Sequence, residues 1–144
     1  WYRAEFATKD LPAGARRWVN VHDAGTIINP ALAEAQVHGG MSMGIGFGLS
    51  EKLMYDEKTG RALNNNLLDY KLSTFMDHPR LRAYFVENPE PTSAFGTKAL
   101  GEPPTCSIAP AIRNAVYQAT GVGVNDAPVN PHNLFRRMKE EGMI

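Results

Sequence analysis

The sequence predicts a single domain of the α+β (mixed α/β) class over residues 1–144. Two-residue alternation typical of a β-strand occurs at 16–25, and 81–87 is also predicted to be a strand, whereas 108–119 has the 3.6-residue period of an amphipathic helix. Strands and helices follow one another without the regular spacing of repeated βαβ units, which favours a mixed class. The 144 residues, of which 43% are apolar, suffice for one hydrophobic core.

One strand is predicted near the N-terminus, after a lead-in that shows little pattern. The lead-in, residues 1–16, has a short apolar start and then a turn cluster, KDLPAG. In RRWVNVHDAG (16–25), Val19 and Val21 alternate with larger or polar residues, and the segment ends in turn formers. This pattern predicts a strand followed by a turn.

A long helix is predicted to begin after Asn29. Asn29 is a suitable N-cap and Pro30 fits the first helical position. Glycine then recurs every fourth residue, which leaves one smooth helix face formed by Gly40, Gly44 and Gly48. Each glycine in a helix interior costs about 1 kcal/mol relative to alanine, so we expect a backbone or a ligand to approach this face closely.

The middle of the chain is predicted to contain a hairpin, a loop and a second strand. Residues 51–64 favour a hairpin with Gly60 in its turn, and the amide-rich segment 64–79 favours a loop. A strand is predicted at 81–87. The irregular stretch 87–105 is long for a compact domain, and such loops are usually functional or disordered.

Two helices are predicted towards the C-terminus. Ser107 is a candidate N-cap and Gly121 a candidate C-cap for the first helix. Its apolar residues recur at helical spacing: Ile108, Ala111, Ile112, Ala115, Val116 and Ala119. Asn130 and Pro131 are predicted to begin the second helix, which ends at Gly142.

Composition excludes several classes of function. The 15 basic and 15 acidic residues form no basic patch, and no apolar run is long enough to span a bilayer, so we expect no nucleic-acid and no membrane partner. The single Cys106 excludes an internal disulfide and a multi-cysteine zinc or iron–sulfur site. The histidines are too scattered to predict metal ligation: His22, His38, His78 and His132. These features fit a cytoplasmic protein.

The segment GMSMG (40–44) matches the G-x-S-x-G pattern of a serine-hydrolase nucleophile elbow. Ser42 would be the nucleophile, with His22 and Asp23 as imaginable partners. The elbow requires a strand before the serine, whereas the preceding residues favour a helix. A serine hydrolase therefore remains a remote alternative, which Ser42 inside a helix would eliminate.

Gln36 and Glu102 are the candidate functional side chains that their local sequence suggests. The Gln36 amide, before the glycine face, can serve as donor and acceptor for a polar ligand. Glu102 stands between Gly101, which lets the backbone turn, and two prolines, which restrict it towards extended angles. A fixed, ionised carboxylate suits a general base, but an exposed ion pair with Lys98 explains the residue equally well.

Three separated motifs resemble one known family. DAGTIINPALAEAQVHGGMSMGIGFGLSE, NNNLLDYKLSTFMDHP and GTKALGEPPTCSIAPAIRNAVYQATG are together similar to the end of the molybdenum-binding subunit of the xanthine dehydrogenase/aldehyde oxidase family. The likeness runs from about residue 19 to 134 and is strongest to bacterial xanthine dehydrogenases. It implies a fragment of a molybdopterin-binding domain. The lead-in matches poorly, and Ala99 stands where the family often has glycine.

The resemblance implies a molybdenum hydroxylase that oxidises a purine (xanthine or hypoxanthine), a related heterocycle or an aldehyde with oxygen from water. Glu102 would be the catalytic base acting on a Mo–OH group. Gln36 would lie near the molybdenum and its pterin, while Gly96, Thr97 and Lys98 would touch the cofactor. The pterin dithiolene holds the metal in this family, so none of these residues would be a metal ligand.

The resemblance also implies cofactors and partners. The cofactor would be molybdenum-molybdopterin, with the cytosine dinucleotide as one form of it. Iron–sulfur clusters and FAD would reside on partner modules, and the rest of the molybdenum subunit would complete the site. We expect the 144-residue chain alone to be inactive and to retain no cofactor. A non-catalytic assembly or interaction domain of the same ancestry is the alternative.

Overall fold

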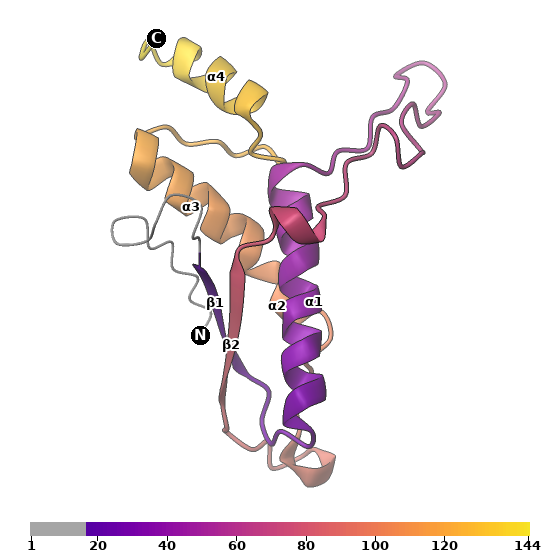
Figure 1. The fold of residues 1–144 in the computed structure, drawn as a ribbon, viewed down its shortest axis with the longest axis vertical. Helices are drawn as coiled ribbons and strands as arrows, with labels where there is room; N and C mark the ends of the chain where they lie inside the picture. The colour runs from indigo at the N-terminus through magenta and orange to yellow at the C-terminus, as the bar shows by residue number, and fades with distance from the viewer. Residues whose placement is uncertain (1–16) are drawn as a thin grey trace.

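The computed structural model describes residues 17–144, and the predicted lead-in at 1–16 lies outside the described residues. Strands β1 (Arg17–Asp23) and β2 (Arg80–Val86) pair in parallel along their whole length, from the Arg17–Arg80 pair to the Asp23–Val86 pair. A parallel pair needs a crossover connection, and here it contains the long helix α1 (Pro30–Leu49). Figure 1 shows α1 beside the two strands. Both predicted strands and the mixed class are confirmed.

Helix α1 begins where its capping residues predict. The Asn29 side chain accepts a hydrogen bond from the Leu32 N–H at 3.1 Å, and Pro30 is the first helical residue. The helix contacts β2, α2 (Pro103–Cys106) and α3 (Ile108–Thr120). It therefore lies at the centre of the fold.

The glycine face of α1 packs against α2 and α3. A Cβ atom added at Gly40 would lie 2.6 Å from the Pro104 Cβ, and one added at Gly48 would lie 2.4 Å from the Ile112 Cδ1. The close approach predicted for this face is therefore confirmed, and helical segments of this chain occupy it. Around this contact lies the core of buried residues: Trp18, Val37, Met41, Ile45, Ile108 and Ile112.

The inward face of β1 carries polar residues as well as Trp18. Asn20 and His22 are each 1% exposed, whereas Val19 and Val21 are only partly buried. Buried polar side chains are costly unless they form hydrogen bonds. The burial of Asn20 and His22 on this face therefore requires specific partners for both side chains.

The segment between α1 and β2 is mostly irregular, and much of it projects away from the helices before its end returns to α1 (Figure 1). Its first part turns back on itself through a Tyr55–Ala62 bridge, with Gly60 at φ 69°, which confirms the predicted hairpin turn. A 3₁₀ turn, η1 (Phe75–Asp77), precedes β2. The most exposed apolar side chains here are 77% to 87% exposed: Leu67, Leu68, Phe75 and Met76.

The two predicted C-terminal helices are present, with one correction. Gly121 ends α3 in a left-handed conformation (φ 78°), as predicted. Ser107 does not cap α3 with its side chain, because the short helix α2 runs directly into α3 and leaves Ser107 with helical angles.

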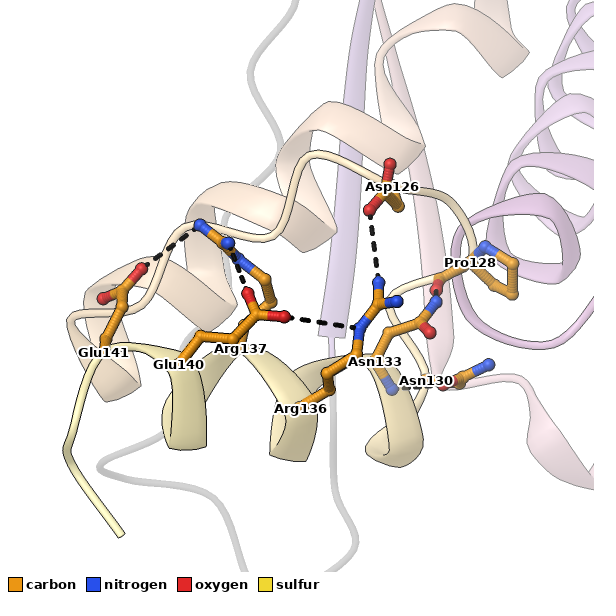
Figure 2. Close-up of polar contacts among 8 residues, drawn as sticks. All are labelled: Asp126, Pro128, Asn130, Asn133, Arg136, Arg137, Glu140 and Glu141. Atoms are coloured by element: carbon orange, nitrogen blue, oxygen red, sulfur yellow. Dashed lines mark hydrogen bonds and ion pairs between the residues drawn. The ribbon is translucent and has the colours of Figure 1, made fainter.

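Helix α4 (Pro131–Glu140) begins at the predicted cap. The Asn130 side chain accepts from the Asn133 N–H at 2.8 Å, and the Asn133 amide donates to the Pro128 carbonyl at 2.8 Å (Figure 2). Ion pairs with Asp126, Glu140 and Glu141 surround the two arginines of this helix (Figure 2). No helix within residues 17–144 combines the length and apolar character needed to cross a bilayer.

Candidate functional site

The loop that leads to Glu102 is hydrogen-bonded to the chain just after β1. The Lys98 N–H donates to the Ala24 carbonyl at 2.9 Å, and the Thr26 N–H donates to the Gly96 carbonyl at 3.0 Å. Gly25 lies between these bonds at φ 65°, and a Cβ there would lie 2.2 Å from the Gly96 oxygen. Only glycine permits this approach, so the loop and the end of β1 form one local unit.

Lys98 pairs with Asp23 instead of Glu102. Its Nζ lies 2.7 Å from the Asp23 Oδ2, across 75 positions of sequence. Hydrogen bonds from Lys98 and from the Gly25 N–H hold the pKa of the Asp23 carboxyl below its ordinary value. The alternative in which an ion pair with Lys98 explains Glu102 is therefore wrong.

Glu102 is exposed and stands at the N-cap position of α2. Its backbone is helical (φ −83°, ψ −36°), which corrects the extended conformation expected before Pro103. The helical angles allow the Thr105 N–H to bond the Glu102 carbonyl at 2.9 Å, which closes the first turn of α2. Gly101 does not adopt a positive φ, so the backbone turn that was expected to require a glycine here is not present. The Glu102 carboxylate has no hydrogen bond or ion pair with any residue in 17–144.

Gln36 lies next to the Glu102 segment. Its Nε2 donates to the Gly101 carbonyl at 3.4 Å, and the residue is otherwise exposed. The fold thus brings together Gln36 of α1 and the residue that precedes Glu102, although 65 positions separate the two bonded residues. The remaining amide N–H and the side-chain oxygen of Gln36 are left for a ligand.

The donors of the loop divide into two groups. The N–H groups of Gly96, Thr97 and Lys98 are all bonded within the chain, as is the Thr97 hydroxyl. In contrast, the N–H groups of Ala99 and Leu100, like that of Gly101, bond no group within the described residues.

A polar cofactor fits these residues. Free backbone donors and an unpaired carboxylate lie along residues 99–102, and the Gln36 amide of α1 lies beside Gly101. Two of the three ammonium hydrogens of Lys98 also bond no group within the described residues. A shallow pocket of about 270 Å³ lies on the Lys98 side of this segment, and Gln36 and Glu102 are not among the residues that line it: Ala24, Thr26, Ile27, Ile28, Asn29, Leu32, Ala33, Thr97, Lys98 and Leu100. Within residues 17–144 no group of three His, Cys, Asp or Glu side chains could hold a metal ion, so the protein atoms described supply no metal cage.

Ser42 lies inside α1, which eliminates the hydrolase alternative. A nucleophile elbow needs a sharp strand-to-helix turn, and Ser42 is in the middle of a 20-residue helix. Its hydroxyl lies 3.1 Å from the His78 Nε2, which also contacts the Ser73 hydroxyl. Of the two residues considered as triad partners, His22 is buried on β1 and Asp23 forms an ion pair with Lys98.

Residues 8–79 match the molybdopterin cofactor-binding domain family, and this match covers half of the chain. The chain belongs to that family. Among relatives of this molybdopterin cofactor-binding domain, the putative xanthine dehydrogenase molybdenum-binding subunit XdhA of Escherichia coli K12 is 54% identical over 128 residues. That match covers 89% of this chain and 17% of XdhA. The aldehyde oxidoreductase molybdenum-binding subunit PaoC of the same strain is 36% identical, over 87% of this chain and 17% of PaoC.

Solved structures agree with this assignment and with the predicted fold. Quinoline 2-oxidoreductase from Pseudomonas putida 86 matches 88% of this chain and 17% of its own, with a TM-score of 0.78 and 33% identity. A Cu,Mo-containing CO dehydrogenase matches 90% of this chain and 17% of its own, with a TM-score of 0.79 and 28% identity. The chain therefore spans about a sixth of the length of the relatives that it matches.

One residue at this site has no counterpart in the sequence prediction. The Asn20 Nδ2 donates to the Pro104 carbonyl at 3.1 Å, in the buried interior and across 84 positions. The position of Asn20 between two valines of a strand is only a weak signal for this contact. It suggests that the Asn20 side chain is buried, and a buried amide requires a hydrogen-bond partner. The identity of the partner cannot be read from local sequence.

Proposed function

We propose that this chain is part of a molybdenum hydroxylase in which Glu102 is the general base. The observation that carries this proposal is the Glu102 carboxylate, which is exposed and unpaired within residues 17–144 while the neighbouring Lys98 is paired with Asp23. An ionised carboxylate without a partner can accept a proton from a ligand. Membership of the molybdopterin cofactor-binding domain family, matched over residues 8–79, supports the molybdenum-hydroxylase part of the proposal.

Each proposed residue has a distinct role. Glu102 accepts a proton from the water-derived oxygen that attacks the substrate carbon. Gln36 orients the cofactor through its free amide atoms, and Lys98 contacts it through its remaining ammonium hydrogens. Gly96 and Thr97 contribute the loop surface against which the cofactor lies. When bound, the cofactor supplies the redox centre that takes up two electrons.

The proposed substrate is a purine, with xanthine as the first candidate, or else a related heterocycle or an aldehyde. The 54% identical relative is named for xanthine dehydrogenase and the 36% identical relative for aldehyde oxidation.

The cofactor is molybdenum-molybdopterin, with its cytosine dinucleotide form as the candidate in this chain. Iron–sulfur and flavin modules accept the electrons, and the complex is cytoplasmic. The isolated 144-residue chain is expected to be inactive, because it spans a sixth of such subunits.

The test uses the full-length protein, purified with its partner subunits and supplied with xanthine, hypoxanthine or an aldehyde. Turnover in water enriched in heavy oxygen should place the label in the product, since the proposed oxygen source is water. A product that takes its oxygen from dioxygen, or the absence of turnover with all three substrates by a fully metal-loaded protein, would contradict the proposal.

A further inference from the structure

Two side chains of β1 reach opposite flanks of Glu102. Asp23 bonds Lys98, four residues before it, and Asn20 bonds the carbonyl of Pro104, two residues after it. The strand that carries both side chains is paired with β2 along its whole length. The segment that bears the carboxylate is therefore attached to a regular element on both sides.

The Asp23 anchor combines charge with geometry. Its Oδ2 accepts from the Lys98 Nζ at 2.7 Å and from the Asn88 Nδ2 at 3.3 Å, while its Oδ1 accepts from the Gly25 N–H at 3.1 Å. About a quarter of the lysine side chain and a third of the aspartate side chain remain exposed. Two backbone hydrogen bonds lie beside the pair, so the loop is held by main chain and side chain together.

The Asn20 anchor is fully buried. Asn20 is 1% exposed, and Pro104, whose carbonyl it bonds at 3.1 Å, is also buried. Proline fixes φ, so holding the Pro104 carbonyl also restrains the residues just before it. The Thr105 N–H bonds back to the Glu102 carbonyl at 2.9 Å, which connects the restrained turn to Glu102 itself.

We propose that Asn20 and Asp23 are positioning residues for the Glu102 carboxylate. Asn20 acts through the Pro104 carbonyl, and Asp23 acts through the Lys98 ammonium group. A loop held at one end can swing about that end, whereas a loop held on both sides presents its carboxylate in one place. The proposal rests on the proposed role of Glu102 for its effect on turnover. Displacement of a reacting group by about 1 Å can cost 100-fold in rate.

The first arm of the test measures turnover of the full-length protein with its partners. Asp23→Asn keeps the shape and the acceptor for Gly25 but removes the charge that Lys98 pairs with. We expect kcat to fall about 10- to 100-fold, with KM and molybdenum content unchanged. Asp126→Asn is the matched control, because it breaks an exposed ion pair with Arg136 (3.6 Å), and it should leave kcat unchanged.

The second arm tests whether Asp23 and Lys98 act as one unit. Lys98→Gln should lower kcat at least as much, because it also removes the proposed cofactor contact, and the double variant should be no slower than Lys98→Gln alone. Independent, multiplying losses would contradict a shared anchor.

The third arm needs neither cofactor nor activity. Hydrogen exchange of the cofactor-free full-length protein is measured at the Lys98 and Thr26 amides, which donate across the Asp23 anchor. Asp23→Asn should raise exchange at both by about tenfold or more, and Asp126→Asn should not. Asn20→Ala should raise exchange at Thr105 in the same way.

These arms separate the two proposals. If Glu102→Gln turns over normally, the base role fails, while the exchange arm still decides whether the anchors restrain the loop. Unchanged exchange at Lys98 in Asp23→Asn would overturn the Asp23 anchor, and unchanged exchange at Thr105 would overturn the Asn20 anchor. Faster exchange with normal kcat in Asp23→Asn would also overturn the positioning role. Should Asn20→Ala fail to fold, Asp23→Asn alone decides the proposal.

Discussion

Gly44 of α1 lies so close to Ile108 of α3 that a Cβ atom added at Gly44 would lie 2.5 Å from the Ile108 Cβ. Two helices can approach this closely only where one of them has a glycine at the point of contact. The glycine repeat is therefore a packing requirement, and its cost in helix propensity is offset by the contact with α2 and α3.

Gly44→Ala is expected to lower the free energy of unfolding by about 1 kcal/mol or more, because overpacking outweighs the gain in helix propensity. Gly39 is the matched control, since it lies in the same helix with nothing within 4 Å of an added Cβ. Gly39→Ala should instead stabilise the protein, by about 0.5–1 kcal/mol. The midpoint of chemical unfolding measures both changes. Equal shifts for the two variants would show that the glycine face is not tightly packed.

Protonation of His22 is expected to destabilise the fold in mild acid. Burial, the largest cause, lowers the pKa of His22 below its ordinary value of 6.5. Between the folded pKa and 6.5 the unfolded chain binds more protons, so stability is fully present above 6.5 and falls as the pH drops through that window.

Unfolding measured from pH 7.5 down to about pH 5 should show this loss, and His22→Gln should flatten it. A His22→Gln variant with the unchanged slope would contradict the assignment.

Ser42→Ala should leave turnover of the full-length protein within about twofold of wild type. The hydroxyl lies in a helix and contacts His78, a geometry that offers no nucleophile elbow. Steady-state kinetics at saturating substrate provide the check. A 100-fold or greater loss of turnover would contradict this prediction and would indicate that Ser42 takes part in the reaction.

Local sequence predicts most of the secondary structure because the signals are local. Asn29, Pro30 and Gly121 act within one turn of their own helix, so their patterns are sufficient to place the ends of α1 and α3. The fourfold glycine spacing likewise predicts a close approach. The partner on that face could not be predicted, since α2 and α3 lie some 60 positions further along the chain.

The candidate site is less predictable, because its contacts join distant segments. Glu102 and Gln36 stand out by residue type and spacing, whereas the Asp23–Lys98 and Asn20–Pro104 contacts span 75 and 84 positions. The backbone of Glu102 departs from the preference expected before proline, because the turn of α2 adds a hydrogen bond that outweighs it. Long-range pairing, not local preference, sets this part of the fold.

The central claim is that the Glu102 carboxylate is the base, and the most direct measurement is the rate of substrate oxidation in a single turnover of Glu102→Gln. Glutamine keeps the shape of the side chain and removes the ionised acceptor, so the rate should fall by about 100-fold or more with molybdenum content unchanged. Glu57→Gln, in the exposed hairpin turn, should react at the wild-type rate. A Glu102→Gln protein that carries full molybdenum and reacts at the wild-type rate would contradict the account.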